Sequence, residues 1–61
     1  MYPYMTFDAA RQALREALND VALDFGADAA DAARSDIVRN IAADCSPDVR
    51  AELLRREGVQ A

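Results

Sequence analysis

The sequence predicts an all-α protein that forms a small three-helix bundle or a more open three-helix array. Its larger apolar residues recur at steps of three and four, and no stretch shows the alternation of apolar and polar residues typical of a strand. Residues that favour helix starts and ends divide the chain into three segments. We therefore expect one domain, 1–61, with helices at about 7–25, 28–45 and 47–57.

The first predicted helix has the clearest boundaries. Thr6 is a suitable N-cap because its hydroxyl can accept from a free amide of the first turn, and Gly26 can adopt the left-handed conformation that ends many helices. Residues 1–5 contain Pro3 and are expected to be extended and to fold back over the bundle. The predicted apolar face, widened by the alanines at 10 and 17, comprises Phe7, Leu14, Leu18, Val21 and Phe25.

The second predicted helix is rich in alanine, which permits close approach to a neighbouring helix. Asp28 can cap it, and Ser35 is a second start signal at which it would bend, although an unbroken helix is favoured. Cys45 continues the apolar face of Ile37 and Ile41. We therefore expect this cysteine to be a small buried hydrophobe and not a reactive thiol.

The third predicted helix is short but well delimited. Ser46 can cap it and Pro47 suits its first position, because proline has no amide hydrogen to lose there. Gly58 can end it. Its buried side is predicted to consist of Val49, Leu53 and Leu54.

The composition limits both the core and the chemistry. A chain of this size buries only about 60% of the surface that its unfolded form exposes, less than a larger domain buries. Fourteen of its 61 residues are alanine, so it also has few large side chains to bury. One cysteine cannot form an internal disulfide, and without histidine we predict no metal site and no cofactor. Association with a second copy or another protein is the remaining source of burial.

The same composition argues against catalysis and against nonspecific binding to anions. The commonest general base, histidine, is absent, so we predict that the protein is not an enzyme. A net charge of -4 disfavours nucleic acid and anionic membranes as nonspecific partners. The lone thiol, with no secretory signal and no apolar stretch long enough to span a bilayer, favours a cytoplasmic location.

An acidic run is the feature that helix formation does not explain. Residues 16–33 contain five acids and no base, and Glu16, Asp20 and Asp24 lie on one helix face at steps of four, where like charges repel. Their spacing does not match a calcium-binding loop. A solvated polar face is the simple explanation, but Leu23 lies among these acids and resembles an anchor within a polar rim. The predicted partner-binding residues are Glu16, Asp20, Leu23, Asp24, Asp28 and Asp31.

These residues lead to a main hypothesis and two alternatives. The main hypothesis is a regulatory module that presents the acidic residues to a basic site on another protein, and acts as an inhibitor if that site normally holds nucleic acid. One alternative is a helix-turn-helix-like DNA-binding regulator that uses Arg50, Arg55 and Arg56, although the third helix is neutral overall and begins with Asp48. The other is a homodimer that completes its core by self-association.

Overall fold

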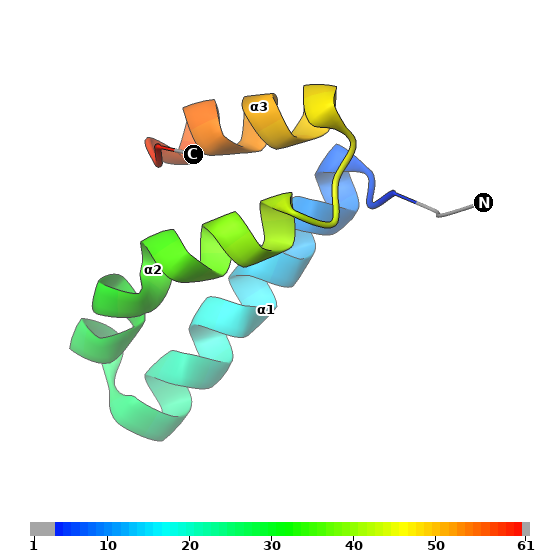
Figure 1. Ribbon diagram of the computed structural model, residues 1–61. Helices are drawn as coiled ribbons and strands as arrows, with labels where there is room; N and C mark the ends of the chain where they lie inside the picture. Colours follow the sequence, from blue (N-terminus) through cyan, green and yellow to red (C-terminus); the bar gives the residue numbers. More distant parts are fainter. Residues whose placement is uncertain (1–3, 61) are drawn as a thin grey trace.

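The computed structural model describes residues 4–60, and it contains three helices. These are α1 (Phe7–Phe25), α2 (Ala27–Ala42) and α3 (Pro47–Glu57). Helices α1 and α2 form a hairpin, and α3 turns back and packs mainly on α2 (Figure 1). The predicted all-α class is confirmed, and the helices are packed compactly; between residues 4 and 60 there is no strand, only an isolated bridge.

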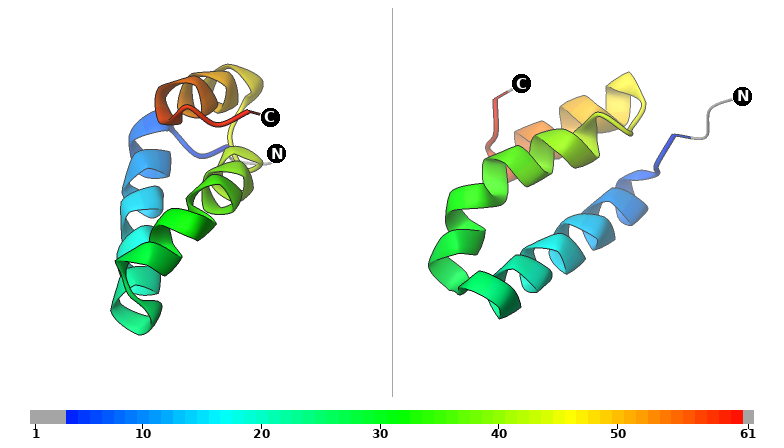
Figure 2. Two further views of the ribbon diagram at one scale, coloured as in Figure 1. Left: turned by 90° about the vertical axis from the view of Figure 1, so that its left-hand side faces the viewer. Right: turned by 60° about the horizontal axis from the view of Figure 1, so that its bottom comes forward.

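Helix α3 covers only one end of this hairpin. In both views of Figure 2 the α1–α2 turn projects beyond α3, which lies against the opposite end. The molecule is correspondingly elongated, with extents of 36 × 22 × 15 Å. One end of the hairpin is therefore covered by α3 and the other end is open.

The predicted caps of α1 and α3 are confirmed. The Thr6 hydroxyl accepts from the amide of Ala9 at 3.1 Å, and the Ser46 hydroxyl accepts from the amide of Val49 at 3.5 Å. Gly58 has φ 69° and ψ 29°, and the Val59 amide donates to the Leu54 carbonyl at 2.9 Å. This is a Schellman ending, in which a left-handed glycine satisfies the last carbonyls of the helix.

The start of α2 differs from the prediction. The helix begins at Ala27, so Asp28 lies in its first turn and is not its N-cap. The capping position belongs to Gly26, whose φ of 96° and ψ of 164° are not the left-handed helical values expected for it. A single residue separates α1 from α2, and it must reverse the chain, which requires an extended backbone with positive φ that glycine adopts readily.

The end of α2 also differs from the prediction. The helix passes through Ser35 without a break and stops at Ala42, so Cys45 is outside it. Cys45 instead forms a parallel bridge with Met5, whose amide donates to the Asp44 carbonyl at 3.0 Å. The chain must leave the helix before the extended cap of α3, because proline at the next position disfavours helical geometry in the residue before it.

The N-terminal segment is described only from residue 4 onward. Met5 packs against the core, as expected for a segment that folds back, but Tyr4 is 55% exposed. The predicted contribution of Tyr2 and Pro3 lies outside the described residues.

The core lies at the end of the hairpin that α3 covers. Val38, Cys45 and Leu53 are fully buried, so the predicted burial of the cysteine is confirmed. The Cys45 thiol donates to the Ile41 carbonyl at 3.4 Å, which satisfies it locally. Leu14 of α1 is also buried, and all three helices therefore contribute to one cluster.

Phe25 was predicted to belong to the buried face of α1, and this prediction is wrong. Its side chain is 76% exposed, although it continues the apolar face of Leu14 and Leu18. The reason is that α3 does not extend to this end of the hairpin, and the first turns of α2 offer mainly alanine and aspartate. The inward face of the α1 helix is thus uncovered in its last turn.

Candidate functional site

The outer face of α1 carries the acidic row found in the sequence. Glu16, Asp20 and Asp24 are all exposed and follow one another at steps of four, so they lie along one side of the helix. Glu16 accepts a hydrogen bond from the Gln12 amide at 3.1 Å. Among residues 4–60, no arginine forms an ion pair with any of the three.

Leu23 lies on the same outer side of α1 and is 76% exposed. At 100° per residue it falls between Asn19 and Asp20 on the helix surface, opposite the buried Leu14. We call Glu16, Asp20, Leu23 and Asp24 the acidic face. It combines one large apolar side chain with three carboxylates that have no cationic partner within the described chain.

The predicted set of partner-binding residues divides into two groups. Asp28 and Asp31 are exposed, as the hypothesis requires, but they belong to the first turns of α2, beyond the turn at Gly26. They add negative charge to the end of the hairpin, yet they come from a different helix and are not members of the α1 row. The six predicted residues are therefore contributed by two helices that meet at Gly26, and only the three acids on α1 form a row.

The arginines are mostly used within the chain. Arg34 pairs with the Glu57 carboxylate, and Arg39 pairs with Asp36 at 3.2 Å. Arg39 also donates to the Gln60 carbonyl at 3.0 Å. These contacts involve α2, the last residue of α3 and the segment after it, and none of them reaches the acids of the α1 row.

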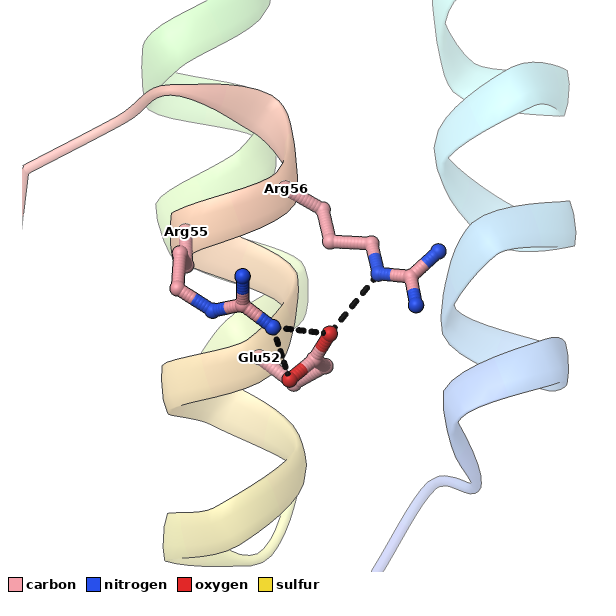
Figure 3. Close-up of polar contacts among 3 residues, drawn as sticks. All are labelled: Glu52, Arg55 and Arg56. Atoms are coloured by element: carbon pink, nitrogen blue, oxygen red, sulfur yellow. Dashed lines mark hydrogen bonds and ion pairs between the residues drawn. The ribbon is translucent and has the colours of Figure 1, made fainter.

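The arginines of the alternative DNA-binding hypothesis also have partners within the chain. Arg55 and Arg56 both donate to Glu52, at 2.6 and 2.7 Å, and together enclose its carboxylate (Figure 3). Arg56 additionally lies 5.4 Å from the centre of the Phe7 ring. Arg50 donates to the carbonyls of Ala42 and Cys45, at 3.1 and 3.4 Å, and so caps the end of α2.

Two titratable groups are shifted by these surroundings. Hydrogen bonds from Arg55 and Arg56 lower the pKa of Glu52, because they stabilise its ionised form. Burial, and then the neighbouring Asp44, raise the pKa of Cys45. A buried thiol with a raised pKa has little thiolate at neutral pH, which fits a packing role.

One concave site involves all three helices and could not be predicted from any single segment. A groove of about 220 Å³ is lined by α1, by Arg34 of α2 and by Glu57 of α3. Arg15, on its α1 wall, has no ion pair or hydrogen bond among residues 4–60, unlike most of the other arginines. We call this the junction groove; its lining residues are Arg11, Leu14, Arg15, Leu18, Arg34 and Glu57.

The remaining surface offers no arrangement suited to a metal or an enclosed ligand. Within residues 4–60, no three histidine, cysteine or carboxylate side chains are grouped so that they could hold a metal ion. The largest hollow, about 380 Å³, is lined only by side chains of α1, so no second element encloses it. Nor is any helix in this part of the chain long and apolar enough to cross a membrane.

Comparison with known proteins adds no relative to this description. No protein-family model, curated protein or solved structure matches the chain.

Proposed function

We propose that this protein is a noncatalytic regulatory module whose acidic face binds a basic site on another protein. If that site normally holds nucleic acid, occupation by this chain inhibits it, because a row of carboxylates competes for the same arginines and lysines. The observation that carries the proposal is the acidic face itself: three exposed carboxylates without cationic partners flank an exposed Leu23 along one side of α1.

The charge distribution supports this choice of partner. Between residues 16 and 33 there are five acids and no base, whereas the rest of the chain holds seven arginines and six acids and is close to neutral. A field of one sign at one end of a small molecule steers oppositely charged partners and accelerates their association. The negative end is also the end that α3 leaves open.

Leu23 supplies what charge alone does not. Exposed charges are screened by salt, and their pairing contributes little free energy unless water is excluded. An apolar side chain beside a row of carboxylates can enter a pocket on the partner and exclude water from the neighbouring ion pairs. The acidic face therefore has the arrangement of an interface centre, with an apolar anchor and a polar rim.

The DNA-binding alternative gains no support from the arrangement of its arginines. Arg50 donates to backbone carbonyls at the end of α2, and Arg55 and Arg56 share the Glu52 carboxylate. These groups would have to leave their partners to reach phosphates or base edges. A fragment of duplex DNA is nevertheless a useful competitor in the experiment that follows.

The test is affinity capture with a matched pair of baits. The wild-type protein and the Asp20→Asn/Asp24→Asn variant, which keeps Leu23 and the helix, are used to capture proteins from a nuclease-treated lysate of the native host. We expect the wild type alone to retain a basic nucleic-acid-handling protein, which is released by salt and displaced by duplex DNA. Equal retention by the two baits would overturn the proposal.

A further inference from the structure

We propose that two copies of this chain form an antiparallel dimer through the face that α3 leaves uncovered. Phe25 of each copy packs against the other copy. This inference goes beyond the proposed function, because it uses the inward face of α1 and leaves the acidic face outside. A second copy of the chain covers this face, because the charges along the face are complementary to those of an antiparallel copy.

The apolar part of this face is the continuation of the core. Leu18, Ala22 and Phe25 follow one another on α1 at steps of four and three, so they lie on one side of the helix. Leu18 is half-buried beside the core, whereas Phe25, one and a half to two turns further on, is 76% exposed. Phe25 is thus a large apolar side chain left in solvent, in a chain that has few of them.

The covering helix ends too early to shield this strip. Glu57, the last residue of α3, reaches Arg34 of α2, and the chain after Gly58 bends back so that the Gln60 carbonyl accepts from Arg39. The polypeptide is thereby directed away from the α1–α2 turn. Within residues 4–60 the last turn of α1 is only partly covered: Ala22 is half-buried, but Phe25 is exposed.

Charges of opposite sign lie at the two ends of the strip. At one end is the junction groove, where Arg11 and Arg15 lie beside the half-buried Leu18 and Arg34 is paired with Glu57. At the other end are the first turns of α2, where Asp31 precedes Arg34 by one turn and has no partner among residues 4–60. The face is thus basic at Arg11 and Arg15 of α1, and it becomes acidic at Asp31 of α2, nearer the turn.

Such an order is complementary to itself when the second copy runs in the opposite direction. A two-fold axis beside Leu18 places the basic end of each copy on the acidic end of the other, and every contact then occurs twice. In this register Arg15 comes opposite Asp31 of the second copy, and Phe25 is covered by the α1 helix of that copy. The contact closes as a dimer and cannot extend into a filament.

Charge also decides between the two exposed faces. The junction groove has three arginines and Glu57, and the exposed Asp28 and Asp31 on the first turns of α2 bring the acids near it to three. Two such faces attract each other when they are antiparallel, whereas two copies of the acidic face would repel. The dimer therefore presents two acidic faces outward, and a partner with two basic sites would bind it with increased avidity.

Sedimentation equilibrium of the full chain at low ionic strength tests the dimer, with a closely matched pair of substitutions. Phe25→Ala and Leu23→Ala each truncate a side chain that is 76% exposed, two residues apart but on opposite sides of α1. We expect Phe25→Ala to raise the dimer dissociation constant on the order of a hundredfold, since two rings are lost per dimer, and Leu23→Ala to leave it unchanged.

Charge exchange then tests the register. Arg15→Asp places like charges across the interface, so we expect the dissociation constant to rise on the order of tenfold or more. The double variant Arg15→Asp/Asp31→Arg restores the opposed pair on both sides of the axis and should recover most of the loss. A wild-type chain that stays monomeric at millimolar concentration, or a dimer that weakens with Leu23→Ala and not with Phe25→Ala, would overturn the inference.

Discussion

The end of the molecule covered by α3 and the end formed by the α1–α2 turn consist of similar helical backbone but of different side chains. At the covered end, Val38, Cys45 and Leu53 are fully buried. At the turn, the helices meet through alanines, and Leu23 and Phe25 are each 76% exposed. The comparison indicates that one end supplies the stability of the fold, and the other is available for contact.

The use of charge follows the same division. The ion pairs of the described residues lie within α2, within α3 or between these two helices. They include the Arg34–Glu57 and Arg56–Glu52 pairs. The carboxylates near the turn, such as Asp24 and Asp28, have no such partners within residues 4–60. Electrostatic interactions therefore support packing at the covered end and remain unused at the turn.

The largest expected difference between the two ends comes from truncating one leucine at each. Leu53→Ala removes a fully buried side chain and should lower the free energy of unfolding by about 2–5 kcal/mol, because it leaves a cavity. Leu23→Ala should change it by less than about 0.5 kcal/mol. Urea unfolding followed by circular dichroism measures both.

A chain of this size has little stability to lose, so a smaller truncation keeps the comparison measurable. Val38→Ala removes less volume from the same core and should still cost roughly 1–3 kcal/mol. Equal effects at Val38 and Leu23 would contradict the assignment of the core to the covered end.

The next effect in size concerns two arginines. Arg50 donates to the Ala42 and Cys45 carbonyls at the end of α2, so Arg50→Ala should lower the free energy of unfolding by about 1 kcal/mol. Arg15, which has no partner among residues 4–60, is the matched control. Thermal unfolding at a chain concentration low enough to exclude association should show a loss for Arg50→Ala only.

Much of this fold could be predicted from the sequence because its caps are chemically explicit. Thr6 and Ser46 have hydroxyls in the right positions, and Gly58 has the conformational freedom that the end of α3 requires. The boundaries of α2 were predicted less well, because Asp28 resembled a cap and Cys45 continued a helical period. A tight reversal at Gly26 and the bridge to Met5 are tertiary features without a local signal.

The candidate sites show the same limit more strongly. Helical periodicity placed Leu23 correctly on the outside of α1, because that inference needs only one helix. The same periodicity placed Phe25 inside, and that prediction failed because burial depends on where α3 ends. The junction groove, to which all three helices contribute, could not be found from any one segment.

A smaller change in stability is expected from removing charges on α1, and its sign should differ between the two ends of the helix. Replacing Asp20 and Asp24 with asparagine relieves repulsion and removes anions from the negative end of the helix, so stability should rise by roughly 0.3–1 kcal/mol at low salt. Asp8→Asn is the control, because Asp8 lies in the favourable first turn and its loss should destabilise α1. Both effects should shrink in 1 M salt, and stabilisation by Asp8→Asn would contradict this account.

The smallest effect is a pH dependence confined to the covered end. Arg55 and Arg56 lower the pKa of Glu52 in the folded chain below its ordinary value of 4.5, so the folded state binds this proton less readily than the unfolded state. The contribution of the pair is present above that ordinary value and is lost as the pH falls through the lower folded value. Glu52→Gln removes this contribution, so its destabilising effect in urea titrations should be seen at pH 6 and should disappear at lower pH. Glu16→Gln, which removes a carboxylate that forms no ion pair, should show no comparable change, and a pH-independent effect of Glu52→Gln would show that the contacts of Glu52 stabilise α3 by packing and not by charge.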